Sequence, residues 1–185
     1  GISIIILLAI FCLAIILLTY LIMYVPKFDY IQARILSFFN RESGTHNFQS
    51  DKALDSITSG GFFGKGIGEG TLKNRVPEAH TDYIISVISE EFGVVAIMLI
   101  LLLFLIFIYM VFKKISFETD DKIKLILIGS ISLILMQATI HIGVNIRLFP
   151  TTGMTLPFLS YGGSSIISTS ILAGIILNLT KRKIN

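Results

Sequence analysis

The sequence predicts an all-α protein, a multi-pass transmembrane helical bundle. Hydrophobic residues make up 54% of its 185 residues and charged residues 15%, with a mean hydropathy of +0.83. Soluble domains carry about 25% charged residues, so this is not an ordinary soluble domain. Four apolar runs approach the ~20 residues with which a helix crosses the ~30 Å hydrocarbon core. Since the chain starts at Gly1 within apolar sequence and shows no secretory-signal pattern, we expect a part of a longer membrane protein.

The predicted spans are residues 2–25, 83–112, 123–141 and 164–180. Pro26 closes the first, and Lys113 and Lys114 close the second. Because basic residues beside short loops mark the cytoplasmic side, the loop 113–122 and the tail 181–185 are expected inside. The large loop 26–82 and the segment 142–163 are then extracytoplasmic. The net charge of +3 lies beside apolar runs, so a nucleic-acid partner is not expected.

The outer loop contains two helical patterns and a glycine run. Residues 27–39 place apolar side chains at helical spacing, which predicts an amphipathic helix on the membrane surface or, alternatively, a soluble capping helix. The stretch "DKALDSITS" predicts a short helix, and "GGFFGKGIGEG", with six glycines, an irregular loop. This run lacks the spacing of a nucleotide-binding loop. It is either a mobile or tightly turned loop, or a wall over a site where Lys65 or Lys73 meets a phosphate.

The start of the second span carries an acidic stripe. On helical spacing Asp82, Ser86, Ser89, Glu90 and Gly93 share one face, which favours a position facing the bundle or a wet cavity. A continuous helix from residue 83 to 112 exceeds the hydrocarbon core, so its first turns should project outward, with Asp82 ~12 Å beyond Glu90. The acids therefore predict a site at the outer membrane face. The competing interpretation of Asp82 is a helix N-cap, shared with Thr81.

The third span ends in a polar face, because Gln137, His141 and Asn145 recur at four-residue spacing. The following segment is apolar but contains Pro150 and Pro157, which predicts a re-entrant-like stretch folded back where protein satisfies its backbone. At its entrance, Arg147 suits a carboxylate, a phosphate or lipid headgroups. The three histidines, His46, His80 and His141, show no metal-site spacing, and no metal ligands are predicted.

Three segments carry a family resemblance: "GGFFGKGIGEG", "VPEAHTDYIISVISEEFG" and "FPTTGMTLPFLSYGGSS". They resemble signature segments of the SEDS family (shape, elongation, division and sporulation) of bacterial cell-wall proteins, in the family's order. The resemblance covers essentially the whole chain and implies the C-terminal part of a ten-helix protein, from about the seventh helix onward. The stretch "FQSDKALDSITSGGFFGKGIGEGTLK" is more similar to the division branch, FtsW, than to the elongation branch, RodA.

This resemblance implies a peptidoglycan glycosyltransferase of the bacterial cytoplasmic (inner) membrane. Family members join lipid II units, disaccharide-pentapeptides on undecaprenyl pyrophosphate, at the outer face during cell division. The implied partners are a class B penicillin-binding protein and other divisome membrane proteins. No cofactor is evident from the sequence, and a divalent cation is compatible with the chemistry. The fragment by itself is expected to be inactive.

The resemblance also implies that Asp82, in "HTD", is catalytic, as the general base on the acceptor sugar hydroxyl. The expected substrate contacts are Lys65, Lys73, His80, Glu90, Arg147, Ser160 and Ser164. A lipid II flippase is one alternative, since ionisable residues and broken helices also suit transporters. A non-enzymatic divisome scaffold is another. The uncharged middle of the second span, Val94–Tyr109, favours chemistry at the outer face over transport.

Overall fold

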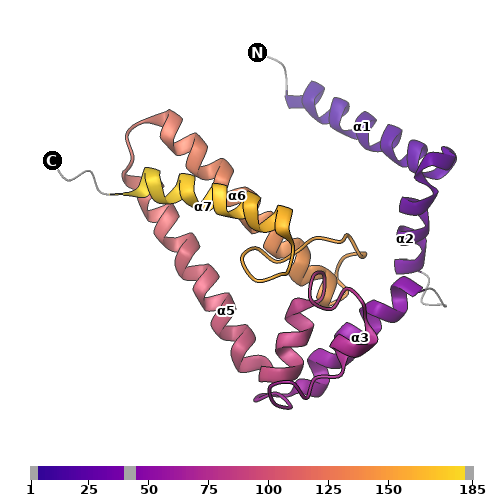
Figure 1. The fold of residues 1–185 in the computed structure, drawn as a ribbon. Coiled ribbons are helices and arrows are strands. Elements are labelled where there is room, and N and C mark those ends of the chain that lie inside the picture. Colours follow the sequence, from indigo (N-terminus) through magenta and orange to yellow (C-terminus); the bar gives the residue numbers. More distant parts are fainter. Residues whose placement is uncertain (1–3, 40–44, 182–185) are drawn as a thin grey trace. The chain divides into compact units, whose positions relative to one another are not determined.

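The computed structural model describes residues 4–39 and 45–181, the side chains of 45–47 excepted (Figure 1). These residues form helices and turns without a strand, which confirms the all-α class. In the described part of the chain, four helices are long and apolar enough to cross a membrane: α1 (Ile4–Tyr24), α5 (Ile84–Phe117), α6 (Asp121–Asn145) and α7 (Gly163–Thr180). Residues 2 and 3 of the first predicted span, the His46 side chain and residues 182–185 of the predicted tail lie outside this description.

The chain divides into two compact units, Gly1–Phe48 and Gln49–Asn185. In the first, α1 buries none of its side chains. Pro26 follows it and opens a 3-10 turn, η1 (Pro26–Phe28), before α2 (Asp29–Phe39). The helix predicted over 27–39 therefore begins as a tighter turn, because proline suits the first helical position but continues no ladder. Its location on a membrane surface stays a prediction.

In the second unit α6 packs against both α5 and α7 (Figure 1). Their shared core consists of Val111 of α5, Leu127, Ile131 and Ile134 of α6, and Ile176 of α7. The three α6 residues follow the i, i+4, i+7 pattern of one helix face. The helix α6 starts with an N-cap, since the Asp120 side chain accepts a hydrogen bond from the Lys122 amide at 2.8 Å.

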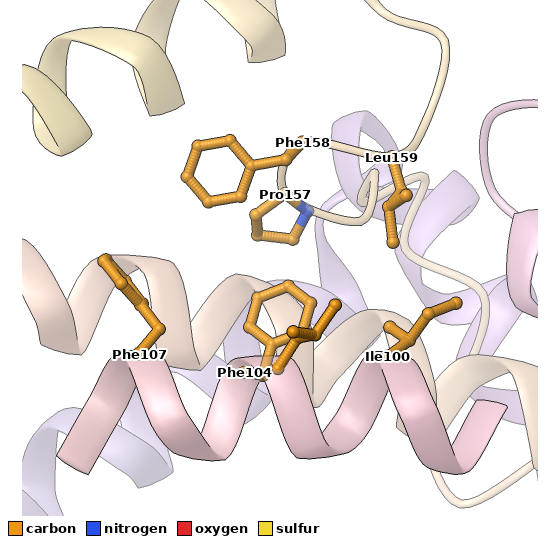
Figure 2. Close-up of a pocket in the computed structure, with 7 residues that line it drawn as sticks. Ile100, Phe104, Phe107, Pro157, Phe158 and Leu159 are labelled. Carbon is orange, nitrogen blue, oxygen red and sulfur yellow. The ribbon is translucent and has the colours of Figure 1, made fainter. Parts of the chain in front are cut away.

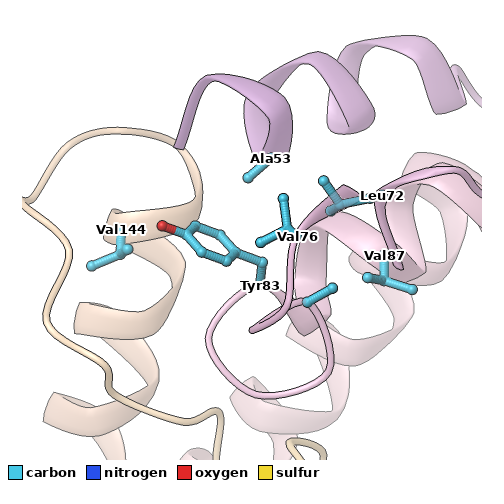
Figure 3. Close-up of a cluster of buried hydrophobic side chains, with 7 residues drawn as sticks. Ala53, Leu72, Val76, Tyr83, Val87 and Val144 are labelled. Atoms are coloured by element: carbon cyan, nitrogen blue, oxygen red, sulfur yellow. The ribbon is translucent and has the colours of Figure 1, made fainter. Parts of the chain in front are cut away.

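A second core joins the helices between α2 and α5 to the ends of α5 and α6. It contains Ala53 of α3 (Thr45–Gly60), Leu72 of α4 (Leu72–Arg75), Val76, Ala79, Tyr83, Val87 and Val144 (Figure 3). The Tyr83 ring lies at the centre of this cluster, 1% exposed, with its hydroxyl 3.3 Å from that of Ser50. The helix α3 is longer than the stretch "DKALDSITS" suggested. The residues just before α5 are thus anchored in a packed core.

The helix α5 is broken at Gly93, where φ is 78° and ψ is −177°. Figure 1 shows its ribbon turning sharply near its start. The prediction of one continuous helix over 83–112 is wrong at this residue, because an extended glycine with positive φ interrupts the helical ladder. Residues 84–92 leave the axis of residues 94–117. Asp82 and Glu90 both precede the break, so their expected ~12 Å separation does not run along the axis of residues 94–117.

Candidate functional site

The glycine run 60–70, here called the glycine clip, closes the break in α5. An interrupted helix leaves carbonyls unpaired on one side of the break and amides on the other. The clip supplies the partners: Lys65 N donates to Glu90 O (2.8 Å), Gly66 N to Glu91 O (3.1 Å), Val94 N to Gly61 O (2.9 Å) and Val95 N to Phe62 O (3.3 Å). A Cβ at Gly93 would overlap the Phe62 carbonyl, and one at Gly64 the Glu91 carbonyl. The glycines thus permit close backbone contact in a tightly turned loop.

Glu90 is buried under the clip, with 1% of its side chain exposed. Its carboxylate accepts hydrogen bonds from Lys65 Nζ at 2.8 Å, Thr71 Oγ1 at 3.1 Å and the Leu72 amide at 3.0 Å. A buried carboxylate is tolerated when it is paired and hydrogen-bonded in this way. Beside it lies a polar pocket of about 270 Å³ between α3, the clip and α4.

Lys73 binds the neighbouring acid, with its ammonium 2.9 Å from Glu91 Oε1 and 2.8 Å from the Gly68 carbonyl. Lys65 and Lys73, expected to meet substrate phosphates, therefore have carboxylate partners within the chain. The third expected contact in this region, Glu90, is enclosed by its own partners. Their contact with substrate stays a prediction. In the structure they form ion pairs that join the clip and α4 to α5.

The polar face of α6 holds the helix-breaking segment after it. Gln137 Nε2 donates to Thr155 O and Ser165 Oγ, both at 3.0 Å. The fully buried His141 lies 2.8 Å from the Met154 carbonyl through Nδ1, which must carry the proton because a carbonyl only accepts. In the described part of the chain, Nε2 has no partner. The segment is folded back onto side chains that satisfy its backbone, as its sequence predicted.

Asn145, the last residue of α6, is fully buried and uses its whole hydrogen-bonding capacity. Its Nδ2 donates to the carbonyls of Asp82 at 2.9 Å and His141 at 2.8 Å. Its Oδ1 accepts from the Ser86 amide at 3.3 Å and the Ser86 hydroxyl at 2.7 Å. One side chain thus connects the end of α6 to both sides of the start of α5.

The backbone of the "HTD" segment is held at three consecutive carbonyls. The donors are Tyr161 N to His80 O (3.1 Å), Ser160 Oγ to Thr81 O (2.7 Å) and Asn145 Nδ2 to Asp82 O (2.9 Å). These donors belong to the segment after α6 and to α6 itself. The His80 side chain remains exposed. The structure therefore brings His80 and Ser160, two expected substrate contacts, into the neighbourhood of Asp82.

The Asp82 side chain is partly exposed and lies beside the turn at Gly153. A Cβ placed on Gly153, whose φ is 71°, would lie 3.6 Å from Asp82 Oδ2. The N-cap hypothesis for Thr81 and Asp82 is wrong, because the N-cap of α5 is Tyr83 and no capping bond comes from a side chain there. The Thr81 hydroxyl instead donates to the Glu78 carboxylate at 3.0 Å.

The remaining expected contacts lie in different surroundings. Ser160 is 3% exposed and its hydroxyl, which donates to Thr81, also accepts from the Leu156 amide at 2.8 Å. It therefore holds the segment together. Arg147 forms an ion pair with Asp51 of α3. Ser164 is exposed in the first turn of α7. Their contact with substrate stays a prediction.

An apolar pocket of about 380 Å³ lies between α5 and the segment after α6 (Figure 2). It is lined by Ile100, Leu103, Phe104 and Phe107 of α5 and by Pro157, Phe158 and Leu159. Phe158 has a φ of 66°, a conformation that bulky residues rarely adopt. The pocket borders the segment that Ser160 ties to Thr81, so the Asp82 region and this apolar surface share one supporting element.

Sequence reasoning recognised Asn145 as part of a polar face but did not connect it to Asp82. The four-residue spacing was the available signal. The partner segment lies 63 residues away, and no local pattern encodes that pairing. Gly153, whose turn borders the Asp82 carboxylate, is not among the site residues that the sequence predicts. Among residues 4–39 and 45–181, no three His, Cys, Asp or Glu side chains gather where they could hold a metal ion.

Comparison with known proteins identifies the family. The family model described as "Cell cycle protein", that of FtsW, RodA and SpoVE, matches residues 1–185. Two similar proteins are both named "Probable peptidoglycan glycosyltransferase FtsW". The one from Caulobacter vibrioides is 37% identical over 158 residues, 84% of this chain and 40% of that protein. The one from Enterococcus hirae is 36% identical over 160 residues, 85% of this chain and 40% of that protein.

A solved structure described as "Structural coordination of polymerization and crosslinking by a peptidoglycan synthase complex" contains a similar chain. The TM-score is 0.70 at 27% identity, and the match covers 94% of this chain and 47% of that one. The present chain thus spans less than half the length of the relatives it matches. Together with its four candidate spans, these matches make it part of a multi-pass membrane protein that belongs to the FtsW/RodA/SpoVE (SEDS) family, on the FtsW branch.

Proposed function

We propose that the whole protein is a peptidoglycan glycosyltransferase that polymerises lipid II during cell division, at the outer face of the cytoplasmic membrane. The names of its FtsW relatives and its similarity to a chain of a peptidoglycan synthase complex support this function. The observation that carries it in this chain is the position of Asp82. The backbone of residues 80–82 is held by α6 and by the segment after it, while the Asp82 carboxylate stays partly exposed.

In this proposal Asp82 is the general base. The acceptor sugar hydroxyl attacks the anomeric carbon of the donor sugar, its proton passes to the Asp82 carboxylate, and the bond from that carbon to the pyrophosphate oxygen breaks. A base must lie within hydrogen-bond reach of the hydroxyl, which a partly exposed carboxylate on a fixed backbone permits. The polyprenyl-linked sugars would reach it from the membrane surface.

The departing pyrophosphate requires positive charge. Lys65 and Lys73 serve this purpose only by exchanging Glu90 and Glu91 for the phosphate, since both ammonium groups are paired in the structure. No step is assigned to a metal. A divalent cation bound by the pyrophosphate itself remains compatible with the reaction.

The topology and partners form part of the same proposal. Lys113 and Lys114 favour a cytoplasmic location for the loop between α5 and α6, which puts the C-terminus inside and residues 26–82 and 142–163 outside. A class B penicillin-binding protein is the proposed synthase partner, alongside other divisome membrane proteins. The similarity to a chain of a synthase complex supports such an assembly.

The test is Asp82→Asn in the full-length protein, purified with its synthase partner, with polymer formation from lipid II as the measurement. We expect the rate to fall by about 10²-fold or more, the usual contribution of a general base. The complex should stay intact, because the carbonyl bonds of residues 80–82 do not involve the Asp82 side chain. Glu78→Gln, an acid-to-amide change in the same exposed turn, is the matched control and should polymerise normally.

Normal polymerisation by Asp82→Asn would remove Asp82 from the chemistry. If lipid II instead crossed vesicle membranes in proportion to the amount of the protein, the flippase alternative would replace the enzymatic one. If neither activity depended on the protein, a scaffold function would remain.

A further inference from the structure

The inference concerns Asn145, whose amide contacts the backbone on both sides of the N-cap of α5. We propose that Asn145 is a positioning residue that fixes the Asp82 carboxylate in its working place; this rests on the proposed function. It would act through Asp82 and contact no substrate. Four hydrogen bonds, complete burial and one permitted amide orientation support it.

The orientation of the amide is determined by its neighbours. The carbonyls of Asp82 and His141 only accept, and the Ser86 amide only donates. Rotating the group by 180° would set its oxygen against two carbonyls and its NH₂ against an N–H. Inside a protein such mismatches are expensive, whereas a fully satisfied buried network is rigid. Asn145 therefore holds one arrangement.

Asn145 also replaces the missing N-cap of α5. With Tyr83 as N-cap, the Ser86 amide is the N3 donor, which a capping side chain ordinarily satisfies. Here the acceptor is Asn145 Oδ1, from a different helix. The same side chain holds the Asp82 carbonyl through Nδ2. The start of α5 and the residue just before its cap are therefore positioned together by the end of α6.

The turn beside the Asp82 carboxylate is held by the same helix, α6. Gly153 borders Asp82 Oδ2, and the next residue, Met154, is held by His141, one turn before Asn145 on α6. The distance between the Asp82 carboxylate and the turn at Gly153 thus depends on His141 and Asn145, which lie one turn apart on α6. A displacement of about 1 Å at a reacting group can cost about 10²-fold in rate. Asn145 is the residue whose loss would release Asp82 directly.

The experiment compares Asn145→Asp with Gln137→Glu in the full-length protein with its synthase partner. Asn145→Asp keeps the shape and the acceptor for Ser86, but sets an oxygen against the Asp82 carbonyl. Gln137→Glu makes the same amide-to-acid change two turns away on the same polar face, where the partners are Thr155 and Ser165. We expect Asn145→Asp to lower kcat by about tenfold or more, with KM for lipid II within about threefold. Gln137→Glu should lower kcat less.

A loss of fold would be detected by the yield and thermal unfolding of the complex. If the Asn145→Asp protein does not assemble, Ser86→Ala tests the proposal instead. This change removes the 2.7 Å hydrogen bond from the Ser86 hydroxyl to Asn145 Oδ1 and keeps the backbone N–H of residue 86. Its kcat should fall about two- to tenfold, the value of one hydrogen bond, at unchanged KM.

The proposal is overturned if the stable variant has the parent kcat, or if Gln137→Glu lowers kcat as much as Asn145→Asp. If Asp82→Asn is inactive in the same assay, either of these outcomes disproves the positioning role of Asn145 and leaves the proposed function standing. If Asp82→Asn is also active, the proposed function fails first.

Discussion

The ammonium of Lys65 lies 2.8 Å from the buried carboxylate of Glu90, 25 residues later in the chain. This ion pair sits where the glycine clip crosses the break in α5. The backbone of Lys65 also donates to the Glu90 carbonyl, so both the main chain and the side chain of one residue secure the end of the first helical piece. The clip, the break and the ion pair therefore form one structural unit.

Glu90→Gln should lower the free energy of unfolding by about 1–2 kcal/mol, because it removes the charge that faces Lys65 while keeping an acceptor for Leu72. The effect is moderate because Lys65 is 36% exposed and can turn toward water. Thermal unfolding in detergent measures it. Glu69→Gln, an exposed position of the same clip, should change stability by less than about 0.5 kcal/mol. Equal midpoints for both variants would show that the pair contributes nothing.

Gly93→Ala should destabilise the protein by more than about 3 kcal/mol, since its φ of 78° and ψ of −177° belong to glycine and the new Cβ would overlap the Phe62 carbonyl. The purified yield and unfolding midpoint are the measurements. Gly129→Ala, on α6 with open space around it, should be neutral or stabilising by about 0.5–1 kcal/mol. A Gly93→Ala protein as stable as the parent would mean that the break and clip are not formed.

Arg147→Gln and Asp51→Asn should lower the free energy of unfolding by similar amounts. The double variant should be at least as stable as the less stable of the two single variants. The reason is their ion pair, whose coupling is expected at about 0.5–1 kcal/mol because both side chains are partly exposed. Unfolding midpoints in a double-mutant cycle measure the coupling, and KM for lipid II should stay unchanged. A raised KM in Arg147→Gln alone would instead support the substrate contact that the sequence predicted.

The polar face of α6 shows what can be predicted from local sequence. The spacing of Gln137, His141 and Asn145 predicted a polar face, and the two prolines after it predicted a segment folded back onto protein. Both predictions follow from local properties, namely the helical period of the polar residues and the inability of proline to continue a helix. The same reasoning offered a helix cap as the alternative role of Asp82 and predicted one straight helix over residues 83–112, whereas the N-cap of α5 is Tyr83 and the helix breaks at Gly93. The cap is supplied from α6, by a side chain 59 residues from its partner Ser86.

The sequence by itself determined the all-α class, the four apolar spans and the polar face of α6, because run length, composition and period are local properties. Gly93 lies inside an apolar run, and a glycine there is ordinarily tolerated in a helix. Only the tertiary structure decided that it breaks α5, because the clip must be present to satisfy the freed backbone groups. The tertiary structure also determined that Lys65 pairs with Glu90, that Arg147 pairs with Asp51, and that Asn145 donates a hydrogen bond to the Asp82 carbonyl. These contacts join residues 25 to 96 positions apart, where geometry rather than neighbouring sequence selects the partner.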